Sequence, residues 1–265
     1  MVTPLMDRII GHLPYSIAVW WRHFLVWQRT VWSSLAMQTV NPVLYLFAFG
    51  FGLGAIVGEM GGMDYLTFIV PGMMAYSMMF TASFEASISA YSRLTMQQTW
   101  SAILATPVTL FELMLGEAGW AIAKGLLSAS GVIIVAYLWG GIGSLSGALI
   151  SMVVLALAGF TLSACGLAAT AHARNWEFIS YFMTFWVTPK FIFSGVFFSI
   201  DRFPSYVQAL SWLLPTTHVI SVIRPLTAGQ PLHLGMALLH LLVLAALGGV
   251  MFWLAHRKLK ARLFD

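Results

Sequence analysis

Charged residues are scarce in this chain. Asp, Glu, Lys and Arg make up only 8% of the 265 residues, whereas 60% are hydrophobic. So little polar surface cannot cover the apolar side chains in water, which excludes a soluble globular protein. We therefore expect an all-α polytopic membrane protein whose single transmembrane domain covers residues 1–265.

Cysteine is almost absent, and a cleavable signal peptide is not evident. The one cysteine, Cys165, lies in an apolar run, so an intrachain disulfide is excluded and the redox compartment cannot be inferred. Asp7, Arg8 and Pro14 interrupt the pattern that a signal peptide would need. We expect the N-terminal segment to be retained.

Enzyme and nucleotide-binding motifs are missing as well. The sequence contains no His-Glu-x-x-His, and 143–147 only approaches Gly-x-Ser-x-Gly. It also lacks the glycine-rich Lys-Ser/Thr loop that cradles ATP phosphates. His233 and His240 share a helical face, a pattern more typical of interhelical hydrogen bonds than of metal ligands. We expect no catalytic residue, no metal, no cofactor in this chain and no nucleic-acid partner.

Long apolar segments, by contrast, make up most of the chain. Six of them are near or above the roughly 20 residues that a bilayer requires; they cover 34–57, 65–90, 110–139, 145–171, 178–200 and 232–256. The first five spans and their loops fill 34–200, and 231–265 holds the sixth span and a basic tail.

Residues 1–33 precede the first span and carry an amphipathic pattern. Ile17, Trp20, Phe24, Trp27 and Val31 share one helical face, opposite a face with Arg22, Arg29 and Ser33. Tryptophan favours the headgroup layer, so the pattern predicts a helix that lies along the membrane surface. A simple extension of the first span into water is the alternative.

The distribution of basic residues gives the orientation. A cytoplasmic N-terminus places most of them inside, and only Arg202 and Arg224 outside. The inside set is Arg8, Arg22, Arg29, Arg93, Arg174, Arg257, Lys258, Lys260 and Arg262. We therefore expect both termini to be cytoplasmic.

The segment 201–230 lies between the last two spans and is too short to cross a bilayer twice. Gly195 breaks the preceding apolar run, and Pro204 and Pro215 interrupt the segment itself. Irregular backbone at membrane depth is tolerated only where protein or a cavity satisfies its polar groups. The pattern predicts an external re-entrant helical hairpin that covers a path.

Glycines and charges inside the spans need partners. Gly50, Gly54 and Gly58 form a flat stripe for close helix packing, either within one subunit or between two. Glu85 and Lys124, or Glu117 and Arg93, would neutralise each other as a structural brace; a proton or ion relay is the other interpretation. Lys190 either faces a polar conduit or snorkels.

Several short stretches, in this order and spacing, resemble the ABC-2 exporter permeases, in particular the NodJ-type lipo-oligosaccharide export subunits. The stretches are 45–54, 81–85, 98–100, 115–117, 120–124 and Ser194-Gly-Val-Phe-Phe198, followed by Pro204, Pro215 and Arg224. The resemblance covers nearly the whole chain, although no single stretch is as specific as a nucleotide-binding loop.

The resemblance implies a permease subunit in a bacterial inner membrane. Two copies would form the pathway, and two copies of a separate P-loop ATPase, which holds ATP and Mg, would bind below. The substrate would be an amphiphile such as a lipo-oligosaccharide, a lipid-linked glycan or a lipid. The alternative is a stand-alone channel or ion-coupled transporter that uses Glu85, Glu117 and Lys124.

The resemblance also assigns residues. The segment 93–107 would couple to the ATPase through an apolar docking surface, with Trp100 either at that surface or anchored in lipid headgroups; its residues are Arg93, Trp100, Ile103, Leu104 and Pro107. The pathway would be formed chiefly by the first and fifth spans, and we expect its aromatic wall to be Tyr45, Phe49, Tyr181, Phe185 and Trp186; the alternative is that these are lipid-facing or core aromatics. Lys190 is a further conduit candidate, at a position on which the resemblance says nothing. The outer gate would consist of Ser194, Gly195, Phe197, Phe198 and Arg224, and Arg224 would either cap freed backbone carbonyls, a purely structural role, or meet an anionic headgroup.

Overall fold

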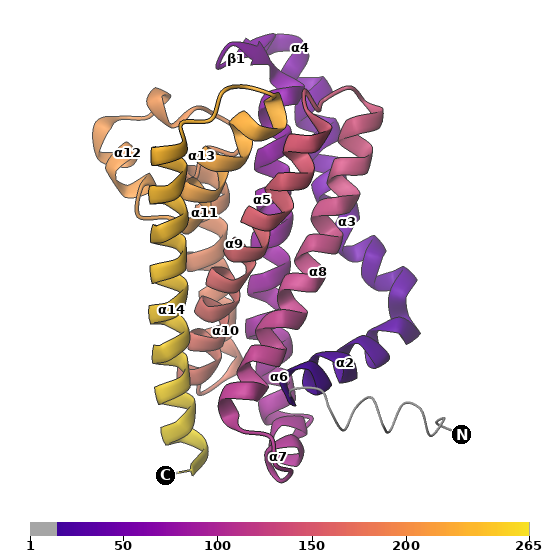
Figure 1. Ribbon diagram of the computed structural model, residues 1–265, viewed down its shortest axis with the longest axis vertical. Helices are drawn as coiled ribbons and strands as arrows, with labels where there is room; N and C mark the ends of the chain where they lie inside the picture. Colours follow the sequence, from indigo (N-terminus) through magenta and orange to yellow (C-terminus); the bar gives the residue numbers. More distant parts are fainter. Residues whose placement is uncertain (1–14, 265) are drawn as a thin grey trace.

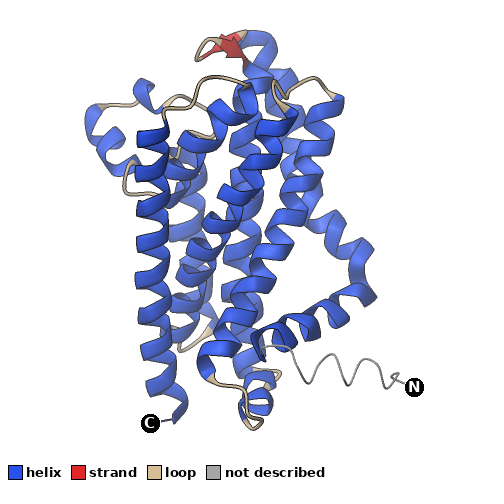
Figure 2. Ribbon diagram, in the orientation of Figure 1, coloured by secondary structure: helices blue, strands red, loops and turns tan. Residues whose placement is uncertain are grey.

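A computed structural model describes residues 15–264 of the chain. Figures 1 and 2 show an elongated helical bundle whose only strands, among the described residues, form a small hairpin at one end. In that hairpin β1 (Glu59–Met60) pairs antiparallel with β2 (Met63–Asp64). The expected absence of a signal peptide, and Arg8 of the orientation argument, lie outside the described residues.

The helices follow one another with short connections. The first half consists of α2 (Tyr15–Trp27), η1 (Gln28–Thr30), α3 (Val31–Phe47), η2 (Ala48–Leu53), α4 (Gly54–Val57), α5 (Tyr65–Phe84), η3 (Glu85–Ser89), α6 (Ala90–Thr95) and α7 (Thr99–Leu104). The second half consists of α8 (Leu110–Leu138), α9 (Leu145–His172), α10 (Trp176–Tyr181), η4 (Phe182–Val187), α11 (Thr188–Phe193), η5 (Ile200–Arg202), α12 (Ser205–Ser211), α13 (Pro215–Ala228) and α14 (Leu234–Phe264).

Five helical segments are long and apolar enough to cross a membrane. They are Tyr15–Val57, Tyr65–Thr95, Leu110–Leu138, Leu145–His172 and Leu234–Phe264, which correspond to five of the six expected spans. The expected span 178–200 is instead a helix of three pieces, α10, η4 and α11, which ends at Phe193. Its π-helical middle and Pro189 account for the break from regular α-helix.

Helix α5 is the centre of the bundle. It packs against α3, α8, α9 and α13, so it is buried on all sides and has no single apolar face. Met73, Met74, Met78 and Met79 are fully buried within it. Because Met is unbranched and flexible, it fills the irregular space between four neighbouring helices.

The glycine stripe of the first span packs inside the subunit. A Cβ at Gly50 would lie 2.6 Å from Leu66 Cδ1, and one at Gly54 would lie 3.5 Å from Tyr65 Cδ1, both on α5. Gly58 ends α4 at a positive φ of 68°. Of the two expected uses of the stripe, the structure shows packing within one subunit.

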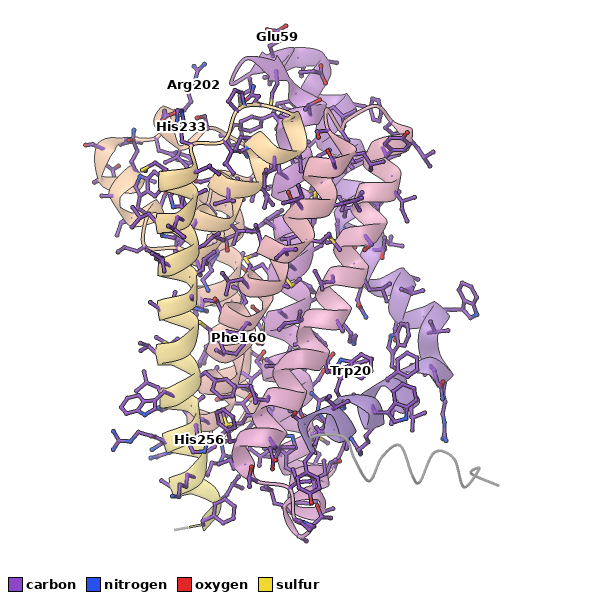
Figure 3. The ribbon with its side chains drawn as sticks, in the orientation of Figure 1. Trp20, Glu59, Phe160, Arg202, His233 and His256 are labelled. Carbon is purple, nitrogen blue, oxygen red and sulfur yellow. The ribbon has the colours of Figure 1, made fainter. Side chains whose placement is uncertain are left out.

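Helix α2 runs at a steep angle to the bundle, and the chain bends back at η1 into α3 (Figure 1). Trp20 and Trp27 of α2 make edge contacts with Trp120 of α8, and Figure 3 shows Trp20 turned toward the bundle. The packing of α2 within the subunit does not follow the expected apolar face. Val19 and His23 are the buried residues of α2, whereas Ile17 is 42% exposed.

The segment after α11 forms a helical hairpin at the β-hairpin end of the bundle. Its arms are α12 and α13, and α13 packs against α5, α9 and α14. Gly147 makes this contact possible, because a Cβ there would overlap the carbonyl oxygen of Leu226. The amide of Ser144 also donates to Thr227 O at 2.9 Å. Two helices joined by residues 212–214 therefore occupy the segment where a hairpin was expected, and the end of α13 is tightly joined to α9.

Candidate functional site

A buried arginine joins two carboxylates near the α7 end of the bundle. Arg93 is on α6, Glu85 begins η3 and Glu117 is on α8. Arg93 donates from Nη1 to Glu85 Oε1 at 3.0 Å and from Nε to Glu117 Oε1 at 3.1 Å. Nη2 makes further bonds to Glu117 Oε2 and to the Glu85 carbonyl. The guanidinium thus holds both carboxylates with the forked geometry that Arg favours.

Three more side chains complete this network. Lys124 Nζ lies 2.7 Å from Glu85 Oε2, and Trp100 Nε1 donates to Glu117 Oε1 at 2.8 Å. His23 Nε2 lies 3.2 Å from the same Glu117 oxygen, off the line of a hydrogen bond. The two alternative ion pairs expected from the sequence are both present, in one cluster.

The network neutralises itself. Two carboxylates face two permanently cationic groups, and the residues of both carboxylates are at most 4% exposed. Removing one partner from a buried pair leaves an uncompensated charge, which costs about 3–5 kcal/mol. Such a closed network can fix α6, α7 and α8 relative to one another.

The expectations for Trp100 are wrong in both forms. Its side chain is fully buried and bonded to Glu117, so it neither lies on an exposed docking surface nor reaches lipid headgroups. Helix α7 is instead held by Trp100 from within. Ile103 and Leu104 are half-buried against the core, and Pro107 is exposed. Ser101, Ala102 and Ala105 in and just after α7 are exposed, and Ala102 faces the space between α7 and α2.

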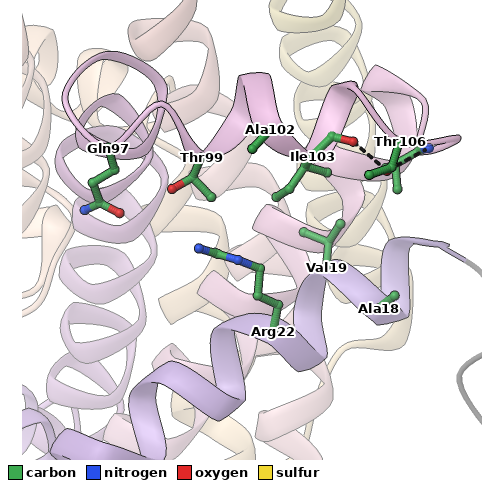
Figure 4. Close-up of a pocket in the computed structure, with 9 residues that line it drawn as sticks. Ala18, Val19, Arg22, Gln97, Thr99, Ala102, Ile103 and Thr106 are labelled. Atoms are coloured by element: carbon green, nitrogen blue, oxygen red, sulfur yellow. Dashed lines mark hydrogen bonds between the residues drawn. The ribbon is translucent and has the colours of Figure 1, made fainter. Parts of the chain in front are cut away.

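A pocket of about 410 Å³ separates α2 from the α7 region. Arg22 of α2 points into it, toward Thr99 and Ile103, as Figure 4 shows. Gln97 and Thr106 also line it. The sequence placed Arg22 on a polar face exposed to water, whereas the structure directs its side chain toward α7. The pocket leaves room for α7 and α2 to change their separation.

The expected conduit aromatics form two groups. Tyr45 and Phe49 belong to an aromatic cluster, where Phe49 and Phe197 have ring centroids 4.6 Å apart and Tyr45 and Phe191 are 5.7 Å apart, although Tyr45 is still 36% exposed. The other three lie on an open face: Tyr181 is 58% exposed, Phe185 73% and Trp186 43%. Of this exposed group, Tyr181 and Trp186 line an apolar groove of about 410 Å³ between α9, α10 and α14, together with Phe178 and Phe182.

Lys190 lies behind this open aromatic face. It is 1% exposed, and its Nζ has no hydrogen-bond partner but lies 4.0 Å from the centre of the Trp186 ring. Ser194 Oγ, one helical turn further on, is also buried without a partner. Snorkelling to the membrane surface is excluded by this burial. A cation–π contact is the one favourable interaction of the ammonium with the described residues.

The expected outer-gate residues cluster around the loop after α11. Arg224 of α13 donates from Nη2 to Gly195 O and from Nε to Phe68 O at 3.3 Å, and it lies 3.9 Å above the Phe68 ring. Gly195 has a φ of 80°, which only glycine adopts readily. Tyr65 donates to Phe197 O at 3.1 Å, while Phe198 is 43% exposed. Ser194, Gly195 and Phe197 are buried.

A histidine pair joins the helical hairpin to α14. The interhelical hydrogen bond expected of His240 is present, since its Nδ1 lies 2.8 Å from Nδ1 of His218 on α13, but the sequence pattern did not identify His218 as the partner. His218 Nε2 is 2.9 Å from Trp212 O, so it donates there and Nδ1 accepts from His240. Burial lowers the pKa of His218, although the bond to Trp212 opposes this shift. No helical periodicity could have paired residues on separate helices.

Comparison with known proteins agrees with these features. Residues 16–227 match the ABC-2 type transporter family. Nodulation protein J of Rhizobium meliloti is 36% identical over 248 residues, or 93% of each chain, and that of Sinorhizobium fredii is 35% identical over 94% of each. Inner membrane transport permease YadH of Escherichia coli K12 is 27% identical over 78% of this chain and 80% of its own. The chain is a multi-pass inner-membrane transport subunit and belongs to the ABC-2 type transporter family.

Proposed function

We propose that this chain is the permease subunit of an exporter, that two copies form the pathway, and that a separate P-loop ATPase drives it. The observation that carries the proposal is the construction of α7. This short helix lies at one end of the bundle, is anchored by Trp100 to the buried network, and presents small residues outward. A surface that is both exposed and rigidly connected to three helices is suited to receive force from a docked ATPase.

The pathway is proposed to run along the open aromatic face of α10, η4 and α11. We propose that this helix, the fifth expected span in chain order, also crosses the membrane and brings the number of spans to six. In this proposal the α7 end of the bundle and both termini are cytoplasmic. Tyr181, Phe185 and Trp186 are too exposed to be core residues of one subunit. Aromatic faces stack on sugar rings and slide along acyl chains, so a second copy facing them would enclose a route for an amphiphile such as a lipo-oligosaccharide or lipid-linked glycan.

The buried charges favour this function over a stand-alone ion-coupled transporter. Glu85, Glu117 and Lys124 all have charged partners at hydrogen-bond or ion-pair distance. A relay would need to release and rebind a proton or ion, and every such step would leave a partner charge uncompensated. The network is therefore assigned a bracing role.

Copurification tests the docking surface. A P-loop ATPase chosen from the genes beside that of this chain is coexpressed with tagged permease, and Ala105→Arg is placed at the exposed end of α7, outside the pocket between α2 and α7. The matched control is Ala209→Arg, on the exposed face of α12 at the opposite end. We expect the α7 variant to lose most of the copurified ATPase and its ATP-driven export while still inserting in the membrane. Equal recovery of ATPase with both variants would refute docking at α7.

A further inference from the structure

A second pocket, at the hairpin end of the bundle, is built around Arg224. It has a volume of about 350 Å³ and lies between the β-hairpin, α13 and the start of α14. Its polar lining consists of Ser199, Ser221, Arg224, Gln230, His233 and His240. No carboxylate from the described residues lines it, and none of the salt bridges among residues 15–264 involves Arg224.

Arg224 has donors left over after its structural bonds. A guanidinium carries five N–H groups, and Arg224 uses one on Nε for Phe68 O and one on Nη2 for Gly195 O. Five minus two leaves three, one on Nη2 and both on Nη1. The two acceptors are neutral carbonyls and the Phe68 ring is neutral as well. The cation is therefore fixed in position while its charge remains uncompensated.

The neighbouring side chains add further donors. Ser221 lies one helical turn before Arg224 on α13, so both face the same side. The side chains of Ser221, Gln230 and His233 line the pocket, and none of them has a side-chain hydrogen bond within the described part of the chain. His233 lies at the hairpin end of the bundle beside α14, as Figure 3 shows.

We propose that this pocket binds an oxyanion of the phosphate type, with Arg224 as the fixed cation and Ser221, Gln230 and His233 as the surrounding donors. Arg presents a planar fork that matches phosphate oxygens, and a low local dielectric strengthens the contact. We place the start of α14 at the depth of the lipid headgroups, because α14 is long and apolar enough to cross the membrane. The phosphate belongs either to a resident phospholipid or to the exported amphiphile. Binding does not depend on the ATPase, so it can be tested separately from export.

The first experiment measures the melting temperature of the purified permease in detergent. Inorganic phosphate is compared with chloride at equal ionic strength. We expect phosphate at about ten times its dissociation constant to raise the melting temperature by roughly 2–4 °C. Ala237→Leu, at a buried position that lines the pocket, narrows the pocket without removing any of its polar groups and should abolish the shift, as should Arg224→Gln. His233→Ala, at an exposed position, should reduce it.

Ala246→Leu is the matched control, because it adds the same side chain to an exposed position of α14 outside the pocket. It should retain the full shift. An equal phosphate shift in Ala237→Leu and Ala246→Leu would overturn the proposal, even if Arg224→Gln fails to fold.

The second experiment distinguishes the two sources of phosphate by native mass spectrometry. The permease is incubated in mixed micelles with phosphatidylglycerol or with diacylglycerol, which has the same acyl chains and no phosphate. If the permease retains phosphatidylglycerol and the Ala237→Leu variant does not, the site binds a phospholipid headgroup. A phosphate shift without phosphatidylglycerol retention assigns it to the exported amphiphile. A permease that shows no phosphate shift and no selective retention would contradict the proposal outright.

Discussion

Arg93 and Arg224 are both arginines inside the helix bundle, one near α7 and the other near the helical hairpin. Arg93 is joined to two carboxylates, whereas Arg224 bonds to two backbone carbonyls and stacks on a phenyl ring. Both hold distant segments together, but only the charge of Arg93 is balanced by its partners. A buried charge that is neutralised by the protein is suited to bracing, and one left uncompensated is available to a ligand. Lys190 belongs with Arg224 in this respect.

The largest effect is expected when Arg93 is removed from the buried network that it forms with Glu85 and Glu117. Arg93→Leu leaves Glu85 with Lys124 alone and Glu117 with no permanent cation. We expect the free energy of unfolding in detergent to fall by about 3–5 kcal/mol. Lys260→Leu, at an exposed position of α14, should change it by less than a tenth of that amount. Similar stability in the two variants would show that the network is not a brace.

A smaller loss is expected at Trp100. Trp100→Phe removes the Nε1 donor and leaves Glu117 Oε1 with one bond fewer in a buried site. The expected cost is about 1–3 kcal/mol of unfolding free energy. Because α7 then loses its anchor, ATPase copurification should fall more than in a surface control such as Lys260→Leu. If Trp100→Phe is less stable but copurifies the ATPase normally, Trp100 stabilises the network without taking part in coupling to the ATPase.

Removing an uncompensated charge should change the unfolding free energy in the opposite direction from removing Arg93. Lys190→Met removes an ammonium with no hydrogen-bond partner and keeps an apolar side chain of similar length. We expect stability to be unchanged or to rise by about 1 kcal/mol, since no partner charge is stranded. If Lys190 serves the pathway, export falls all the same. A loss of stability as large as that of Arg93→Leu would remove the distinction between the two kinds of charge.

The smallest effect is expected at a solvated carboxylate. Glu112 on α8 accepts from the Thr109 amide at 2.8 Å and completes a capping box with it. Glu112→Gln keeps a side chain that can accept the same bond, so the melting temperature should fall less than in any destabilised variant above. A drop comparable to that of Trp100→Phe would mean that the start of α8 depends on this charge.

The sequence was sufficient for features that depend on composition and local pattern. The apolar runs predicted four spans close to their observed bounds, and the expected first span, 34–57, lies within the longer helical segment Tyr15–Val57. The charges within the spans identified the partners Glu85, Arg93, Glu117 and Lys124. An isolated charge in a hydrocarbon layer is so costly that a partner is expected among the charges at similar depth. That physical constraint narrows the choice to a few residues.

Contacts between segments far apart in the chain could not be predicted from the sequence. Trp100 fits a docking surface, a headgroup layer or a buried bond equally well by composition, and only tertiary packing brings Glu117 within 2.8 Å of its indole. His218 and His240 are on different helices, and no periodicity relates them. The expected span 178–200 extended too far, because the apolar run continues past Phe193, although the break predicted at Gly195 lies only two residues after the end of the helix.

The contact of α13 with α9 has a mechanical consequence. Gly147 leaves no space beside the carbonyl of Leu226, and Ser144 is bonded to Thr227, so the far end of α13 is fastened to the scaffold. The other end meets α12 through the short link 212–214, and α12 is largely exposed. The His218–His240 pair holds the start of α13 as well. Any opening of this hairpin therefore moves α12 about the link 212–214, while α13 stays with the bundle.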